Sequence, residues 1–345
     1  MDKLLISFFV AVAISYILTP YAKRFAYKVG AIDVPKDERR VHTVPIPRMG
    51  GLAIFLAFTI TTLFMAELDK SLVGILIGAT LIAIMGMLDD IKPISAKYKL
   101  LVQFIAAMIV IYSGVKIEYM SIPFVGEWVP LGKLSFFITV FWIIGITNTV
   151  NLIDGLDGLA AGVSVIASLT LAYVAYANNQ PTVAMLLIIL AGGAVGFLPY
   201  NFNPAQIFMG DTGSLLIGFL LATVSIQGVI KSATTIAVAI PVLALGVPVF
   251  DTAFAITRRL VNGRPIMEAD KGHLHHRLLE QGLSQKQTVL VLYFISALLG
   301  GSAVFISDTS VTTAYLFLLT VAFVVIFGAF RFGLVTKSSH RKANM

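Results

Sequence analysis

The sequence predicts an all-α, polytopic integral membrane protein with about eleven transmembrane helices, and three observations support this fold class. Apolar residues make up 58% of the 345 residues and charged residues only 12%, against about 45–50% and about 25% in soluble domains. The apolar residues fall into runs, most of which reach the about 17–25 residues that a helix needs to cross a bilayer. The runs lack the period-two alternation of a membrane β-barrel, and only helices and closed barrels satisfy the backbone in lipid.

The apolar runs follow one another along the whole chain. The first, 4–19, contains Ala11-Val12-Ala13, which looks like a signal-peptide cleavage site, but ten further runs follow and we expect a retained first helix. The fourth run reaches spanning length only if Lys99 and Tyr112 lie at the two interfaces. The connection 114–133 contains Pro and Gly and is expected to be external, with a small hairpin. The predicted runs are 4–19, 50–66, 71–88, 100–113, 134–150, 159–177, 182–199, 214–230, 233–256, 287–306 and 311–330.

Basic residues indicate the orientation. If the segments alternate, 20 of the 25 Lys and Arg residues share one side of the membrane, and the positive-inside rule makes that side cytoplasmic. We therefore expect the N-terminus outside, the C-terminus inside and one transmembrane catalytic domain over 1–345, with a cytoplasmic tail at 332–345. The net charge of +7 then reflects loops that face anionic lipid, so no nucleic-acid partner is expected. The absence of cysteine excludes disulfides, cysteine-ligated zinc and iron–sulfur clusters.

The acidic residues are the unexpected feature. Twelve of the 18 lie on the same cytoplasmic side, several of them at helix ends, although acids contribute little to topology. A carboxylate at a helix end near the membrane is expensive to desolvate. Binding of a divalent cation and a phosphate group would explain why acidic residues lie among basic residues on the cytoplasmic side.

Two polar groups follow apolar runs on that side. Asp89 and Asp90 are adjacent carboxylates that repel each other unless a cation or a proton intervenes. A solvated helix end is the alternative, but three lysines follow and favour a metal or acid/base role: Lys92, Lys97 and Lys99.

The second polar group has a regular spacing. Its members step by three residues, so neighbours share a helical face while the set winds around the axis. Gly155 and Gly158 between them allow another chain or a ligand to approach closely. A polar turn is the alternative, and we favour a binding surface. The group comprises Asn148, Asn151, Asp154 and Asp157.

A third group precedes the eighth run. Asp211 lies between two glycines just before an apolar helix, where the helix dipole and free N–H groups gather. Metal or phosphate binding and a plain N-cap are both consistent with this position. Asn201 and Phe208 lie shortly before it, and a phenylalanine there more often packs than stacks on a base.

Histidines cluster in the loop 257–286. On a helix, His273 would share a face with His276 and Arg277, while His275 would point elsewhere. A zinc site is one alternative, but it would lack cysteine and would lie beside basic residues. Anion binding by histidine and arginine fits better.

Two single residues complete the candidates. Arg48, in Pro47-Arg48-Met49-Gly50-Gly51, is either a topology signal or a side chain aimed at a ligand. Asp251, near the end of the ninth run, is costly in lipid and is expected to pair with a basic residue or to support the site.

These residues together imply phosphoryl or phospho-sugar transfer between a soluble nucleotide and a membrane lipid. The chain has no Walker loop, so it is not a P-loop ATPase. A transporter would place ionisable residues near the bilayer midplane, whereas the middle of nearly every run is uncharged. A structural scaffold would have no use for the acids.

The motifs resemble those of the polyprenyl-phosphate N-acetylhexosamine-1-phosphate transferases over about residues 19–283. Arg48 and the order His273-Leu274-His275-His276 favour the UDP-GlcNAc branch, because the phospho-MurNAc-pentapeptide branch typically has Thr and three consecutive histidines there. The matching segments are 47–51, Leu-Asp-Asp at 88–90, Asn-Leu-Ile-Asp-Gly-Leu-Asp-Gly at 151–158, Phe-Met-Gly-Asp-Thr-Gly-Ser at 208–214 and His-Leu-His-His-Arg at 273–277.

The resemblance implies an enzyme of a bacterial cell membrane that transfers GlcNAc-1-phosphate from UDP-GlcNAc to undecaprenyl phosphate. The products are GlcNAc-diphospho-undecaprenol and UMP, the first membrane step towards a surface polysaccharide such as teichoic acid. Mg²⁺ or Mn²⁺ as cofactor and a homodimer are implied in the same way. The phospho-MurNAc-pentapeptide transferase of peptidoglycan synthesis is the alternative enzyme.

Roles follow from the matching motifs. Asp211 and Asn151 are assigned to the metal, and Asp89 or Asp90 to orienting or deprotonating the lipid phosphate. The remaining assignments are Asp154 and Asp157 to placing the nucleotide, Phe208 to stacking on uracil, and Asn148, Asn201, Arg48, Lys97, His273, His275, His276 and Arg277 to substrate binding. A phosphate monoester has a second pKa near ~6, so the lipid phosphate needs little help from a base. We predict direct attack, with a two-step route through an aspartyl-phosphate as the alternative.

Overall fold

The computed structural model describes residues 2–34, 44–121, 128–230, 237–263, 265 and 272–331. Some of the basic and acidic residues counted from the sequence, together with His42 and the predicted tail, lie outside the described residues. They are Lys36, Asp37, Glu38, Arg39, Arg40, His42, Lys231, Arg264, Glu268, Asp270, Lys271 and the tail 332–345.

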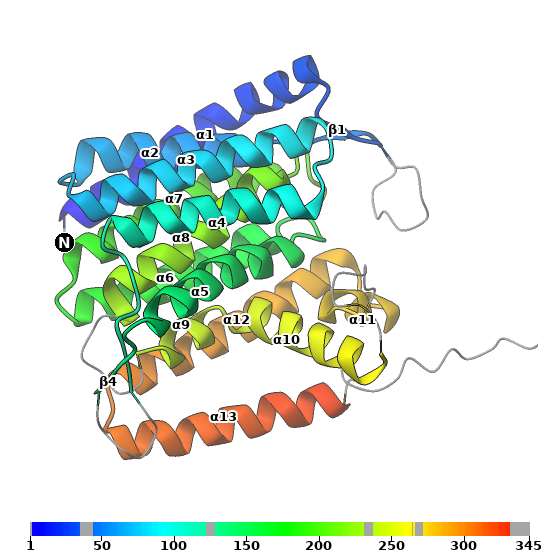
Figure 1. Ribbon diagram of the computed structural model, residues 1–345. Helices are drawn as coiled ribbons and strands as arrows, with labels where there is room; N and C mark the ends of the chain where they lie inside the picture. Colours follow the sequence, from blue (N-terminus) through cyan, green and yellow to red (C-terminus); the bar gives the residue numbers. More distant parts are fainter. Residues whose placement is uncertain are drawn as a thin grey trace, which may run out of the picture.

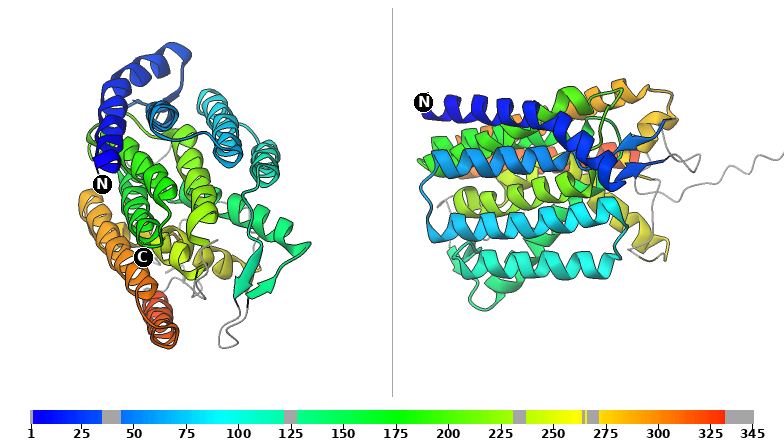
Figure 2. Two further views of the ribbon diagram at one scale, coloured as in Figure 1. Left: turned by 90° about the vertical axis from the view of Figure 1, so that its left-hand side faces the viewer. Right: turned by 90° about the horizontal axis from the view of Figure 1, so that it is seen from above.

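The described residues form a bundle of α-helices, most of which run along one common direction (Figures 1 and 2). Each predicted apolar run corresponds to one long helix, with one exception. The helices are α1 (Asp2–Val29), α2 (Gly51–Met65), α3 (Lys70–Ile91), α4 (Ala96–Tyr112), α5 (Leu134–Leu152), α6 (Leu159–Ala177), α7 (Pro181–Asn201), α8 (Gly210–Ser225) with a π-helical turn η1 (Ile226–Ile230), α9 (Ala239–Ala244), α10 (Gly246–Val261), α11 (Leu274–Glu280), α12 (Gln285–Ser307) and α13 (Val311–Arg331).

The exception is the predicted ninth run, 233–256, which is wrong as a single helix. Within its described part, α9 ends at Ala244 and α10 begins at Gly246. Pro248 lacks the N–H that a continuous helix would need for a bond to Ala244, and its ring disfavours that geometry. Gly246 also lies close to α12, because an added Cβ would be 2.6 Å from Leu299 Cδ1.

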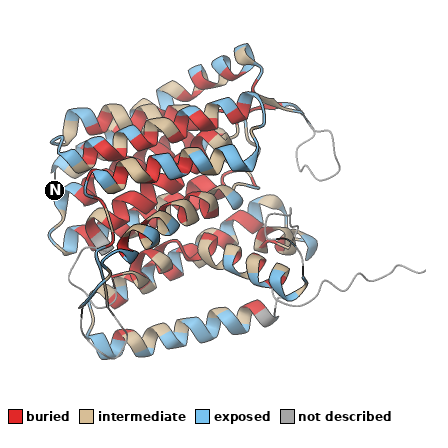
Figure 3. Ribbon diagram, in the orientation of Figure 1, coloured by how far each residue is buried: buried red, intermediate tan, exposed pale blue. Residues whose placement is uncertain are grey.

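The helix lengths and compositions agree with a membrane protein. Eight helices in the described part of the chain are long and apolar enough to cross a bilayer, and α2 is a shorter apolar helix. The α7 and α8 helices form the buried centre, where α7 packs on α1 and α6 and α8 packs on α3 and α5 (Figure 3). The α13 helix is instead exposed along most of its length (Figure 3). Its exposed side chains include large apolar residues such as Leu316, Leu319 and Phe323. Such a surface suits lipid rather than water.

Two short β-ribbons depart from a purely helical fold. Strands β3 (Tyr119–Ser121) and β4 (Trp128–Pro130) pair antiparallel and confirm the hairpin expected within 114–133. Strands β1 (Ile32–Asp33) and β2 (Ile46–Pro47) pair antiparallel and were not expected. They form because Arg48 N–H bonds to Ala31 O at 2.9 Å, which brings the segment before α2 back to the end of α1.

One end of the bundle gathers the polar helix termini. The ends of α3 and α5 and the starts of α4 and α8 meet there, beside β1 and α11 (Figure 1). The candidate site lies at this end of the bundle. The N-outside orientation, the count of eleven spans, the single domain over 1–345 and the homodimer stay predictions.

Candidate active site

The N-terminus of α8 is capped by a carboxylate from another helix. Asp90, buried in the last turn of α3, accepts bonds at Oδ1 from Asp211 N (3.0 Å) and at Oδ2 from Thr212 N (3.1 Å) and Thr212 Oγ1 (2.6 Å). These N–H groups would otherwise lack partners at a helix start. The α3 and α8 backbones come this close because Gly86 has no side chain: an added Cβ would lie 2.6 Å from Thr212 N.

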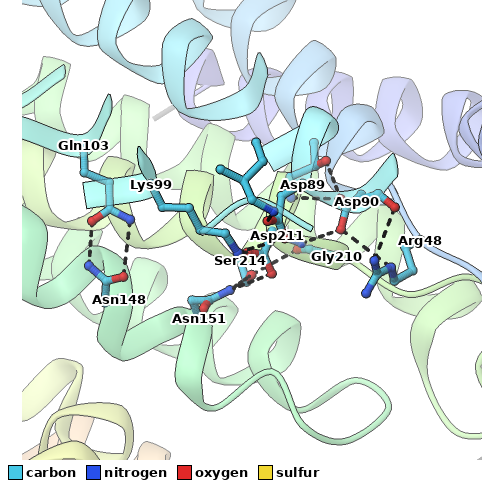
Figure 4. A network of polar contacts seen from close by, with 12 residues as sticks. Arg48, Asp89, Asp90, Lys99, Gln103, Asn148, Asn151, Gly210, Asp211 and Ser214 are labelled. Carbon is cyan, nitrogen blue, oxygen red and sulfur yellow. Dashed lines mark hydrogen bonds and ion pairs between the residues drawn. The ribbon is translucent and has the colours of Figure 1, made fainter. Parts of the chain in front are cut away.

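Lys99 joins the other two carboxylates of this region. Its Nζ lies 2.8 Å from Asp89 Oδ2 and 2.6 Å from Asp211 Oδ2 (Figure 4). Asp89 also accepts a bond from Ile94 N at 2.7 Å. Because one ammonium lies between two carboxylates, the negative charges tolerate each other. The predicted substrate contact Lys97 is exposed at the start of α4, and the structure brings Lys99 to the acids instead.

Asn151 approaches Asp211 from α5. Its Nδ2 donates to Asp211 Oδ1 at 3.2 Å and to Ser214 Oγ at 2.8 Å. Asn148, one turn earlier, does not reach this cluster. Its side chain forms a reciprocal pair with Gln103 of α4.

Arg48 reaches the cluster from the opposite side. Its Nη2 donates to Asp90 O at 3.3 Å, and its Nε lies 3.9 Å from Asp90 Oδ1. Although it is buried, this Nε has no hydrogen-bond partner among the residues that the structure describes. The backbone holds Arg48 in place, because Phe208 N bonds to Pro47 O at 2.8 Å and Gly50 N to Phe208 O at 2.9 Å.

The loop after α5 carries the two remaining acids. Asp157 accepts bonds at Oδ2 from Asn203 Nδ2 and Ala205 N, both at 3.0 Å. Asn201 is buried and binds the loop on both sides, accepting from Gly158 N and donating to Ile207 O, both at 3.1 Å. Its amide is therefore engaged in holding the loop.

Asp154 is different, because its carboxylate makes no hydrogen bond or ion pair within the described part of the chain. Burial at the cleft wall raises the pKa of this carboxyl to about 8, and the negative charges of Asp211, Asp90 and Asp157 add to the effect. The α5 helix ends at Leu152, so the predicted helical face that steps by three ends there and Asp154 lies in a turn.

The histidine cluster is built on α11, and the predicted helical face is wrong. The helix begins only at Leu274, and His273 is extended backbone at the N-cap. His273 and His275 therefore stack, with ring centres 5.8 Å apart and planes 7° apart, instead of pointing to different sides. His273 Nδ1 lies 2.8 Å from Asp251 Oδ2, which confirms the expectation that Asp251 pairs with a basic residue.

Only one of the histidines faces the cleft. His276 lines it, whereas His275 is buried against Gly155, where an added Cβ would lie 2.7 Å from His275 Nε2. Burial, followed by the neighbouring His276, lowers the pKa of His275 to about 3, so this ring is neutral at pH 7. Arg277 donates to Gly272 O at 3.3 Å and does not line the cleft.

These elements surround a cleft of about 530 Å³ at the end of the bundle. Among the predicted residues, the cleft is not lined by Asp89, Asn148, Lys97, His273, His275 or Arg277. The predicted residues that line it are Arg48, Asp90, Asn151, Asp154, Asp157, Asn201, Phe208, Asp211 and His276.

Other lining residues were not singled out from the sequence. Asn203 and Gln285 lie side by side in the wall, with Asn203 Nδ2 donating to Gln285 Oε1 at 2.8 Å. Asp33 lines the mouth from β1. Asn203 lies in the polar segment after α7, which could have drawn attention to it. Gln285 is the first residue of α12, and no sequence pattern near it other than the capping box of that helix marks it as a site residue.

The cleft offers oxygen ligands for a divalent cation, but the described side chains do not form a complete coordination shell. No group of three His, Asp or Glu side chains in the described residues is arranged to hold a metal ion. Asp211 at the start of α8 lies beside Asn151 and the unpaired Asp154. One or two carboxylates completed by substrate phosphates are the usual donor set for Mg²⁺, so these residues fit the ion when a phosphate substrate is bound.

The fold and the site define a polytopic membrane protein that gathers acids and cations in one cleft at the end of its helices. Residues 72–229 match the description "Glycosyl transferase family 4". A Bacillus subtilis protein named as a probable undecaprenyl-phosphate N-acetylglucosaminyl 1-phosphate transferase is 43% identical over 312 residues, which cover 90% of this chain and 87% of that protein.

Two further relatives differ in the substrates that their names state. A decaprenyl-phosphate N-acetylglucosaminephosphotransferase of Mycobacterium tuberculosis is 34% identical over 82% of this chain and 77% of its own. A phospho-N-acetylmuramoyl-pentapeptide-transferase of Caldanaerobacter subterraneus is 33% identical over 89% of this chain and 97% of its own. The chain belongs to glycosyl transferase family 4, the family of these polyprenyl-phosphate sugar-phosphate transferases. It is a multi-pass membrane phosphotransferase, as the motifs predicted.

Proposed function

We propose that the protein transfers GlcNAc-1-phosphate from UDP-GlcNAc to undecaprenyl phosphate, which gives GlcNAc-diphospho-undecaprenol and releases UMP. One observation supports this chemistry most directly. The cleft lies at the end of a membrane bundle and holds carboxylates and cations together, where a soluble nucleotide and a membrane lipid meet. The names of the B. subtilis and M. tuberculosis relatives support GlcNAc as the sugar. A first step towards teichoic acid or another surface polysaccharide of a bacterial cell follows from this product.

We propose Mg²⁺, with Mn²⁺ as a substitute, as the cofactor. Asp211 would hold it, with Asn151 beside it. When bound, the ion neutralises negative charge on the diphosphate. Lys99 shares the Asp211 carboxylate, and the ion pair at 2.6 Å holds this side chain in place.

The engaged acids favour direct attack of the lipid phosphate on the β-phosphorus. Both oxygens of Asp90 are occupied by the α8 N-terminus, and Asp89 is bound by Lys99 and Ile94 N. Neither carboxylate is free to form an aspartyl-phosphate. The lipid phosphate is largely dianionic at pH 7, because its second pKa is near ~6, so positioning contributes most of the acceleration.

The remaining lining residues would position the substrates. Arg48 Nε, which has no hydrogen-bond partner among the described residues, is a donor for a phosphate oxygen, and His276 is a second polar group in the cleft. Phe208 lines the cleft, and we propose that a uracil base would stack on its ring. Asp154 lines the cleft, and its carboxyl has no hydrogen-bond partner among the described residues, so it is available to contact a substrate or the bound ion.

The test is UMP release by the purified protein in detergent with undecaprenyl phosphate and a panel of UDP-sugars. UDP-GlcNAc is expected to be the best donor, with activity lost on chelation and restored by Mg²⁺. Asp211→Asn is expected to abolish UMP release while the protein stays monodisperse. Preference for UDP-MurNAc-pentapeptide would support the alternative enzyme, in line with the C. subterraneus relative. Full activity of Asp211→Asn would refute the metal assignment.

A further inference from the structure

An amide pair joins α4 and α5 next to the site without reaching the cleft. Asn148 Nδ2 donates to Gln103 Oε1 at 2.6 Å, and Gln103 Nε2 donates back to Asn148 Oδ1 at 3.3 Å (Figure 4). Gln103 is 1% exposed, and Asn148 also donates to Ile144 O of its own helix at 2.7 Å. Neither residue lines the cleft, so the pair has no direct contact with a substrate there.

The pair lies one helical turn from two residues of the site. Lys99 precedes Gln103 by four residues on α4, and Asn151 follows Asn148 by three on α5, so each amide shares a helix face with one of them. Lys99 and Asn151 meet on the same carboxylate. Lys99 Nζ lies 2.6 Å from Asp211 Oδ2, and Asn151 Nδ2 lies 3.2 Å from Asp211 Oδ1.

The two contacts on Asp211 therefore depend on the register between α4 and α5. A shift of one helix by a single residue moves its side chains by about 1.5 Å along the axis. Such a shift would pull either Lys99 or Asn151 out of reach of Asp211. Misplacement by about 1 Å is enough to lower a catalytic rate about 100-fold.

An amide pair is suited to set this register. Apolar packing between α4 and α5 tolerates sliding, because one aliphatic contact replaces another. A reciprocal amide pair has one geometry that satisfies both groups, and an unpaired amide among apolar helices is unfavourable.

We propose that Gln103 and Asn148 are positioning residues, which hold α4 and α5 in the register that lets Lys99 and Asn151 act together on Asp211. The inference rests on the proposed function, since it uses the transfer reaction as its readout. It changes the predicted role of Asn148 from binding substrate to placing Asn151.

The experiment compares variants that remove one amide, both amides, or neither. Gln103→Met and Asn148→Leu each keep the approximate volume and leave the other amide without its partner across the helices, although Asn148 keeps its bond to Ile144 O. The double variant Gln103→Met/Asn148→Leu has no unpaired amide and is expected to regain the melting temperature. The exchange variant Gln103→Asn/Asn148→Gln restores both amides.

A matched control removes a hydrogen bond from α5 at its other end. Thr139 is buried and its Oγ1 accepts a bond from Ile117 N, which follows α4, at 3.0 Å. Thr139→Val keeps the shape of the side chain and loses this bond. It is expected to lower the melting temperature as the single amide variants do, with kcat within about twofold of wild type.

A positioning role predicts a separation of kcat from stability. The single variants are expected to lose about 10- to 100-fold in kcat with KM for UDP-GlcNAc nearly unchanged. The double variant is expected to recover stability but not kcat, and the exchange variant to recover part of kcat. Recovery of kcat in the double variant would overturn the proposal, as would single variants with wild-type kcat.

The activity of the wild-type protein distinguishes a failure of the proposed function from a failure of the positioning role. If it releases no UMP from UDP-GlcNAc, the proposed function fails. If it is active and the amide variants behave like Thr139→Val, the positioning role alone fails.

Discussion

Replacement of Asp90 by Asn tests whether this acid anchors the α8 N-terminus or is free for chemistry. The aspartate accepts three bonds from Asp211 N, Thr212 N and Thr212 Oγ1. An asparagine has one acceptor oxygen in place of two. If it keeps both bonds from Thr212, its amide nitrogen takes the place of Oδ1, 3.0 Å from Asp211 N. A donor then faces a donor.

The magnitude follows from these contacts. Loss of one hydrogen bond to a charged acceptor costs about 1.5–3 kcal/mol, and an unsatisfied buried donor adds about 1–3 kcal/mol. Removal of a buried charge offsets part of this, so we expect a loss of about 3 kcal/mol in the free energy of unfolding. For a chain of this size that corresponds to a fall of about 5 °C in melting temperature.

The assay is thermal unfolding in detergent, with Asp154→Asn as the matched variant. Asp154 lies in the same cleft but its side chain makes no hydrogen bond or ion pair within the described residues, and burial together with the neighbouring acids Asp211, Asp90 and Asp157 disfavours its charged form. Asp154→Asn is expected to keep or raise the melting temperature while it lowers UMP release. A melting temperature of Asp90→Asn equal to that of the wild type would refute the anchoring role.

Three further predictions concern other contacts of the site. Lys99→Met is expected to lower kcat about 100-fold, because the ammonium that joins Asp89 and Asp211 is lost. The control Lys97→Met should keep kcat within about twofold of wild type. Equal losses of kcat in both variants would contradict this assignment. Folding depresses the pKa of His275 to about 3, so the stability that its neutral ring contributes is present above pH 6.5 and is lost as pH falls towards 3. Between pH 6.5 and 5, the free energy of unfolding of the wild type in urea should fall by about 2 kcal/mol more than that of His275→Asn. Parallel pH profiles of the two proteins would contradict this prediction. Gly155→Ala should push His275 and α11 away and raise KM for UDP-GlcNAc, because the new Cβ would lie 2.7 Å from His275 Nε2. The control Gly145→Ala, within α5, has nothing within 4 Å of the new Cβ and should leave KM unchanged. An unchanged KM in Gly155→Ala would be the contrary result.

Composition and local pattern were enough to predict the fold class and to point to the acids that gather at the cleft. Long apolar runs allow only helices in lipid, because the backbone has no water to bond, and the structure confirms a bundle of such helices. The scarcity of charge made each acid informative, and Asp154, Asp157 and Asp211 do line one cleft. These conclusions depend on composition and on local pattern, which do not require knowledge of the packing.

The hydrogen-bond partner of each polar residue became known only from the packed helices. Asp90 was expected to act on substrate but caps α8, and the lysine that reaches the acids is Lys99 rather than Lys97. His275 was expected to point away from His273 but stacks on it, because α11 begins one residue later than a helix that includes His273.

The reason is that these contacts join segments far apart in the chain. Asp90 and Thr212 are 122 residues apart and Lys99 and Asp211 are 112 apart, so no local periodicity relates them. A pattern of residues states which groups are available for chemistry. The register of the packed helices decides which of those groups are already engaged with one another and which, like Asp154, are left to face a substrate.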